Sequence, residues 1–304
     1  MKLVQFFLPG KGKRVGVIQG DRVLDITSSD EGVRSTLDLV TQGKTARGIV
    51  TRASWLLKRL HRRATDGREL QPTHSRRRPH LLVPIDAPEV WGTKDAYPRD
   101  DGRSPADRPN DPPHAQSALP GVADTSRPGL FFKATAGRVV GPYAPIAIRQ
   151  DSTCTVPGAG LAIVLGAGGG VVAFTACNDV VARAIERDGP QYASQARVYL
   201  GSCALGPCLV TSEEIEDPRT LQVRCNILRD GKTIFSEATS TAHLRRSVDT
   251  LVSWLLRDNP VPVGTVLSAG TGIPVPDAAA LAHGDQVEIA VQGIGRLSNP
   301  VQGH

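Results

Sequence analysis

Two short segments of the chain carry residue types that could do chemistry. Gly270, Thr271 and Gly272 form a turn whose backbone N–H groups and hydroxyl could bind an oxyanion, although the glycines also suit a tight turn that needs positive φ. Lys133 follows the apolar pair Phe131–Phe132 and could act as a base or form a Schiff base. The alternative for Lys133 is a structural ion pair with a carboxylate. Both segments are therefore candidates for contact with an oxygen-rich anion.

Other glycine and cysteine patterns favour structure over chemistry. Gly166–Gly170 has no Gly-Lys-Ser/Thr after it and has strand-like flanks, so we expect a hairpin and not a phosphate-binding loop. The five cysteines have no metal-ligand spacing, and Cys203 and Cys208 do not make a Cys-x-x-Cys motif. We interpret them as reduced, mostly buried thiols of a cytoplasmic protein.

The basic residues gather in one part of the chain. The net charge is +6, and much of it falls within residues 52–80, which could be a nucleic-acid patch. However, Trp55, Leu56 and Leu60 lie on one helical face, and no aromatic-interleaved basic surface accompanies them. We therefore expect a solvated helix followed by a basic linker, with no nucleic-acid partner. No apolar run approaches about 20 residues, so we expect no membrane partner either.

Periodicity and turn signals predict an α+β chain of two domains. Residues 3–8 and 14–26 are predicted to be strands, and residues 37–63 one or two helices. These elements make a small N-terminal α/β domain over residues 1–82. Residues 83–304 form the larger domain, in which short strands are broken by turns.

Within the larger domain, some segments have their own signals. Residues 93–128 are rich in proline and charge, and we expect a lid there, with His114 as a weak candidate acid. Residues 179–187 predict a short helix, and residues 241–257 predict an amphipathic helix. The turn Arg229–Gly231 predicts a hairpin.

A series of short motifs resembles the fumarylacetoacetate hydrolase superfamily. Each motif is weak alone, but their order and spacing together are specific from about residue 127 onward. The closest resemblance is to the branch that contains the 2-keto-3-deoxy-sugar-acid dehydratases. The motifs are Arg127–Lys133, Val139–Pro142, Ile148–Ser152, Asn178–Arg183, Gln195–Tyr199, Leu205–Pro207, Gly270–Pro274 and the stretch from Gly284 to Val301.

This resemblance implies a fold and a chemistry. The fold would be a mixed β-sandwich roll with a small N-terminal domain, usually assembled as a homodimer. The family's Mg²⁺ or Mn²⁺ is held by carboxylates and acts as a Lewis acid on a 2-oxo acid or β-diketo compound. A chelated 2-oxo acid becomes acidic at C3, which permits loss of water or cleavage of a C–C bond.

The chain departs from the family at the implied metal ligands. Asp179 matches the third ligand, but Gly158 and Gly160 stand where the family has two Glu. Glu186, two helical turns beyond Asp179 in the predicted helix, would lie about 10 Å away and could not replace them. One carboxylate does not make a dedicated Mg²⁺ site, so we predict no metal and no other cofactor. Other departures are Gly129 for Glu, Arg197 for Lys and Ala269 for Thr.

The remaining polar residues that match the family's pocket could still bind a carboxylate. Arginine suits this task because its guanidinium binds carboxylates bidentately. We predict Asp179 as a general base, Tyr199 as a general acid and Lys133 as a further catalytic group, whereas Asp151 is expected to make local hydrogen bonds. The predicted substrate-binding residues are Arg149, Ser152, Arg183, Arg197, Gly270, Thr271 and Gly272.

Three functions remain open from the sequence. The first is a metal-independent lyase, dehydratase or cyclase that acts on a small-molecule 2-oxo or β-dicarbonyl carboxylate, with secondary metabolism as one setting. The second is a catalytically silent relative that binds a ligand or partner. The third is a Mg²⁺-dependent hydrolase or dehydratase with relocated ligands. The retained cations favour the first function.

Overall fold

A large mixed sheet runs through the molecule and joins the two parts that the sequence separates. The computed structural model describes residues 1–60, 64–70, 77–98 and 127–303. The strands of this sheet are β1 (Lys2–Leu8), β2 (Gly12–Gln19), β3 (Arg22–Asp25), β4 (Ala64–Asp66), β5 (His80–Leu81), β6 (Val90–Lys94), β7 (Gly129–Ala134), β8 (Val139–Val140), β11 (Ala159–Leu165), β12 (Val171–Asp179), β14 (Cys203–Thr211) and β17 (Val266–Ser268).

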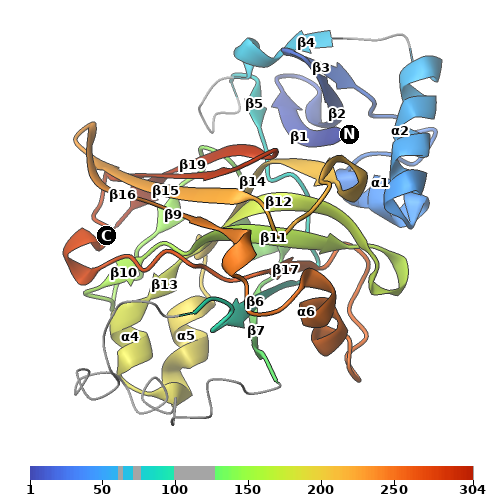
Figure 1. The fold of residues 1–304 in the computed structure, drawn as a ribbon. Helices are drawn as coiled ribbons and strands as arrows, with labels where there is room; N and C mark the ends of the chain where they lie inside the picture. The colour runs from blue at the N-terminus through green and yellow to red at the C-terminus, as the bar shows by residue number, and fades with distance from the viewer. Residues whose placement is uncertain (61–63, 71–76, 99–126, 304) are drawn as a thin grey trace.

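The order of these strands shows where the N-terminal strands attach. The main path is β4-β3-β2-β1-β14-β12-β11-β17-β6-β7, with β5 beside β1 and β8 beside β14 (Figure 1). β1 pairs antiparallel with β14, so that Lys2 lies opposite Val210. The first strands of the chain therefore extend the sheet of the C-terminal part. The domain boundary predicted after residue 82 stays a prediction.

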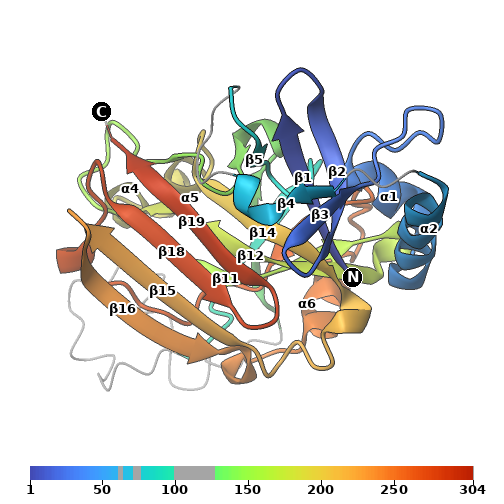
Figure 2. The ribbon, with the colours of Figure 1, turned by 90° about the horizontal axis from the view of Figure 1, so that it is seen from above.

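A second sheet packs on one face of the first. Its order is β16-β15-β18-β19-β9. Figure 2 shows β15, β16, β18 and β19 as a layer in front of β11 and β12. In β18 every second residue is buried, as expected for a strand with one face on a core. These strands are β9 (Ile146–Ala147), β15 (Gln222–Arg229), β16 (Lys232–Ser240), β18 (Gln286–Val291) and β19 (Gly295–Gln302); β10 (Thr155–Val156) and β13 (Val181–Ala182) form a separate pair.

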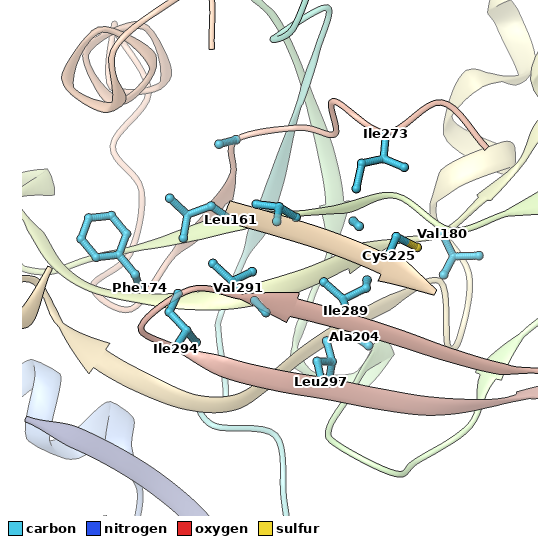
Figure 3. Close-up of a cluster of buried hydrophobic side chains, with 14 of the residues drawn as sticks. Leu161, Phe174, Val180, Ala204, Cys225, Ile273, Ile289, Val291, Ile294 and Leu297 are labelled. Carbon is cyan, nitrogen blue, oxygen red and sulfur yellow. The ribbon is translucent and has the colours of Figure 1, made fainter. Parts of the chain in front are cut away.

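The core between the two sheets is apolar. Leu161 and Phe174 of the large sheet face Ile289 and Leu297 of the second sheet (Figure 3). β11 is buried along its whole length because its alternate residues enter different cores: Leu161, Ile163 and Leu165 in this one, and Ala162 and Val164 in a second one on the other face. The continuous apolar run of β11 is thereby explained.

Helices cover the remaining face and one end of the large sheet. Ser35 forms a capping box with Asp38 at the start of α1 (Thr36–Gly43), and Thr45 caps α2 (Ala46–Arg59). Both helices contribute buried residues to the second core. The other α-helices of the described residues are α4 (Arg183–Arg187), α5 (Ala193–Arg197) and α6 (Val248–Leu255). No helix in the described ranges is long and apolar enough to span a membrane.

The α+β fold class is confirmed, and three element predictions need correction. The helix predicted from residue 179 begins only at Arg183, because Asp179 is the last residue of β12. The helix predicted over 241–257 is shorter, because Ser247 caps its N-terminus. Residues 93 and 94 belong to β6 and not to an irregular lid. The rest of the lid prediction, including His114, mostly lies outside the described residues.

Candidate functional site

A buried ion pair joins β7 to the end of β12. The Lys133 side chain is completely buried, and its Nζ lies 2.6 Å from Oδ1 of Asp179. The same Nζ donates a hydrogen bond of 2.7 Å to the carbonyl oxygen of Val180. A buried charge is costly unless it is paired and hydrogen-bonded, and both conditions are met here. Lys133 therefore neutralises Asp179 from inside the sheet.

Arg197, at the end of α5, approaches Asp179 from the other side. Its Nη1 donates to Oδ2 of Asp179 at 3.3 Å, and its Nε and Nη2 donate to Oε1 of Glu186 at 3.1 and 3.0 Å. The guanidinium also lies over the Phe131 ring, with Cζ 4.5 Å from the centroid. Arginine can make these contacts together because its group is planar, forked and able to stack. Asp179 and Glu186 thus flank one guanidinium.

Lys94 completes what we term the ion cluster: Lys94, Lys133, Asp179, Glu186 and Arg197. Lys94 Nζ lies 2.9 Å from Oε1 of Glu186. Burial opposes ionisation of Glu186, but the charge of Arg197 and the hydrogen bond from Lys94 outweigh it and lower the pKa of Glu186 to about 2. With three cations and two carboxylates, the ion cluster carries a net positive charge.

The glycines at the implied metal positions allow close backbone contact. A Cβ on Gly158 would lie 2.5 Å from the carbonyl oxygen of Asp179, and a Cβ on Gly160 would collide with the carbonyl oxygen of Gly270. The Gly158 N–H donates to Oδ1 of Asn178, and the Asp179 N–H donates to the Gly158 carbonyl. Glycine in a strand often marks such an approach of one backbone to another.

These residues do not fit a divalent metal of the kind that the family implies. Mg²⁺ needs oxygen ligands in near-octahedral order, whereas the carboxylate of Asp179 contacts two cationic side chains. Gly158 and Gly160 supply no side chain and have no room for one without backbone movement. In the part of the chain that the structure describes, no three His, Cys, Asp or Glu side chains gather as a metal site.

Tyr199 lies near the ion cluster and keeps its proton. Its hydroxyl is buried and has no hydrogen-bond partner among the described residues. Burial raises the pKa of Tyr199, and the charge of Asp179 raises it further, while Arg149 opposes the shift. Ser202 holds this segment, since its Oγ donates to the Arg197 carbonyl and accepts from the Tyr199 N–H. Tyr199 is therefore available as a donor beside Asp179.

Two predicted substrate-binding arginines have carboxylate partners of their own. Arg149 makes a two-point contact with Asp151, at 2.6 and 3.1 Å. Arg183 donates to the Val275 carbonyl at 2.7 Å and to Asp277 at 2.9 Å. Each arginine thus has a carboxylate partner within the chain, and its predicted role in substrate binding stays a prediction.

The other predicted binding residues make local turns. Ser152 Oγ donates to the Cys154 carbonyl, and Thr271 Oγ1 accepts from the Ile273 N–H. Gly270 has φ of 81°, a conformation that favours glycine. These contacts fix the backbone and leave the predicted roles of Ser152, Gly270, Thr271 and Gly272 as predictions.

Sequence reasoning missed three residues at this site. Lys94 falls within the predicted lid, and Glu186 is placed too far from Asp179 by a helix that starts four residues later than expected. Tyr97 has a buried hydroxyl without a partner among the described residues. Tyr97, like Lys94, falls within the predicted lid, so no sequence signal distinguished it.

Residues 103–302 match the model of the fumarylacetoacetate (FAA) hydrolase C-terminal family. The chain therefore belongs to this family, which confirms the resemblance read from the motifs.

Similar proteins include named dehydratases. The chain is 37% identical, over 95% of both chains, to a probable 2-keto-3-deoxyxylonate dehydratase of Haloferax volcanii. It is 39% identical to a 2-dehydro-3-deoxy-D-arabinonate dehydratase of Saccharolobus solfataricus, over 73% of this chain and 74% of the other. A solved 2-keto-3-deoxy-D-arabinonate dehydratase complexed with magnesium and 2,5-dioxopentanoate has a TM-score of 0.79 and 30% identity, covering 100% of this chain and 99% of that one. The predicted enzyme class and dehydratase branch are confirmed, whereas the homodimer and the cytoplasmic location stay predictions.

Proposed function

We propose that this protein removes water from a small 2-oxo-3-deoxy sugar acid and that side-chain cations replace a resident divalent metal. The similarity to named dehydratases supports the reaction class. The observation that carries the second part is the ion cluster, in which Lys133 and Arg197 bind the one carboxylate that matches a family metal ligand.

The reaction needs a base, an acid and positive charge. A proton leaves C3, its electron pair forms a C3–C4 double bond, and the C4 hydroxyl departs with a proton as water. The 2-oxo group makes the C3 proton removable, because negative charge spreads onto the oxo oxygen as the proton leaves. Fixed donors and cations at that oxygen would lower the barrier.

Residues of the site suit these roles. Arg197 uses three N–H directions in its contacts with Asp179 and Glu186, and its guanidinium has further donors for a substrate oxyanion. Tyr199 is the acid at the C4 hydroxyl, because its protonated hydroxyl has no hydrogen-bond partner among the described residues. Asp179 is the base. Lys133 is fully buried, so we assign it to positioning Asp179 and not to covalent chemistry.

The test compares Arg197→Lys with Arg197→Met in the dehydration of 2-dehydro-3-deoxy-D-arabinonate. Lysine keeps the charge but cannot form the fork between Asp179 and Glu186. We expect kcat/KM to fall about 10-fold or more in Arg197→Lys and further in Arg197→Met. Equal rates in all three proteins would contradict the role of Arg197. A wild-type protein that binds this compound without turnover would instead be the catalytically silent relative.

A further inference from the structure

Tyr97 is a buried polar group that the roles above do not use. Its side chain is only 5% exposed, and its hydroxyl has no hydrogen-bond partner among the described residues. Buried polar groups in native proteins are nearly always hydrogen-bonded, and one left without a partner costs free energy. Such a group suggests that a partner is supplied from outside the chain.

The position of Tyr97 connects it to the oxyanion turn predicted from the sequence. A Cβ on Gly272 would lie 2.5 Å from Cδ1 of Tyr97, so the ring lies directly over this glycine. Ala96 lies against Gly270 in the same way, with 3.0 Å between its Cβ and a Cβ built on Gly270. The segment is held in place because the Ala96 carbonyl accepts a hydrogen bond from the Arg245 N–H.

The same segment reaches the ion cluster on its other side. Tyr97 follows β6, whose Lys94 binds Glu186 and whose Thr93 donates to the Ser268 carbonyl at 2.8 Å. The Gly270 carbonyl touches Gly160 of β11. The ring of Tyr97 is thus packed on the turn that adjoins Gly160. Its own segment is joined to the ion cluster through Lys94.

The Tyr97 hydroxyl keeps its proton near neutral pH. Burial raises the pKa of Tyr97 to about 12, so the phenol stays protonated. A protonated phenol with no acceptor suits an oxygen-rich ligand, because its hydroxyl, oxo and carboxylate oxygens all accept hydrogen bonds.

We infer that the Tyr97 hydroxyl donates a hydrogen bond to a substrate oxygen beside the Gly270–Gly272 turn and so helps to select oxygen-rich acids. This inference rests on the proposed function for the identity of the substrate. It adds a second phenol to the site, distinct from Tyr199 in sequence and in the element that carries it.

The test is Tyr97→Phe, which removes the hydroxyl alone. The matched control is Tyr192→Phe, at an exposed tyrosine outside the ion cluster. Each protein is assayed for dehydration of 2-dehydro-3-deoxy-D-arabinonate, and its melting temperature is measured with and without this compound. We expect Tyr97→Phe to melt no lower than wild type without ligand, to lose at least 10-fold in kcat/KM and to lose most of the ligand-induced rise in melting temperature.

The outcomes separate this inference from the proposed function. Unchanged kcat/KM and an unchanged ligand response in Tyr97→Phe would overturn the role of Tyr97 and leave the dehydratase proposal intact. A lower melting temperature with an unchanged ligand response would show a structural hydrogen bond and also overturn it. If wild type binds the compound without turnover, the dehydratase proposal fails and the ligand-induced melting shift alone decides the role of Tyr97. A wild type that neither binds nor reacts overturns both.

Discussion

The ammonium of Lys133 lies 2.6 Å from the carboxylate of Asp179, inside the sheet and out of contact with solvent. Two strands of different sequence regions meet at this pair: β7 supplies the cation and β12 the anion. Arg197 binds the other oxygen of the same carboxylate. Asp179, the one implied metal ligand that the chain retains, is therefore already balanced by the protein's own charges.

Lys133→Met should unfold more readily than wild type. Methionine fills much of the same volume but leaves Asp179 buried without its closest cation, which typically costs about 3–5 kcal/mol. The control is Lys13→Met, because Lys13 pairs with Asp86 at the surface, where such pairs contribute about 1 kcal/mol or less. Urea unfolding measures both. An equal decrease in the free energy of unfolding of the two variants would show that the buried pair stabilises the fold no more than the surface pair does.

Gly160→Ala tests the close backbone contact. An added methyl group would collide with the Gly270 carbonyl oxygen, and this oxygen can move only if the whole Gly270–Gly272 turn moves. We therefore expect the free energy of unfolding to fall by about 1–3 kcal/mol. Gly137→Ala is the control, since a Cβ there meets nothing within 4 Å. Equal stability of Gly160→Ala and Gly137→Ala would contradict this prediction. It would mean that the Gly270 turn can move at little cost and that position 160 can accommodate a longer side chain.

Glu186 should give the protein a specific acid sensitivity. Its pKa is lowered from 4.5 to about 2, so the stability that it contributes is complete above pH 4.5 and is lost as the pH falls towards 2. Glu186→Gln should therefore be less stable than wild type near neutral pH, and this difference should shrink through that window. Thermal melting at a series of pH values measures it. Glu237→Gln, at an exposed position on β16, is the control for loss of a carboxylate elsewhere. A constant stability difference between Glu186→Gln and wild type across this pH range would contradict the assignment.

The fold was predictable where the signals are local. The hairpin between β15 and β16 follows from Asp230 and Gly231, which both adopt positive φ in the turn as the sequence suggests. The pairing of β1 with β14 was not predictable, because it joins residues about two hundred positions apart and no turn specifies it. Long-range strand order leaves little trace in one sequence.

The site was predictable by residue type and less so by geometry. The motifs identify Asp179, Lys133 and Arg197, and the structure brings all three together. The place of Glu186 was wrong because its distance was reckoned along a helix, whereas Asp179 ends a strand and the chain turns before α4. Helical periodicity does not predict a change of chain direction between a strand and a helix. This change of direction brings Glu186 into contact with the same Arg197 guanidinium that binds Asp179.

The central claim is that side-chain cations supply the positive charge that the family resemblance assigns to a divalent metal. The most direct measurement is the initial rate of 2-dehydro-3-deoxy-D-arabinonate dehydration by protein stripped with EDTA, before and after addition of Mg²⁺ or Mn²⁺, with calorimetric titration of Mn²⁺ into the same sample. We predict equal rates before and after addition and no stoichiometric Mn²⁺ binding. A rate that disappears on stripping and returns with the metal, together with one Mn²⁺ bound per chain, would contradict the account.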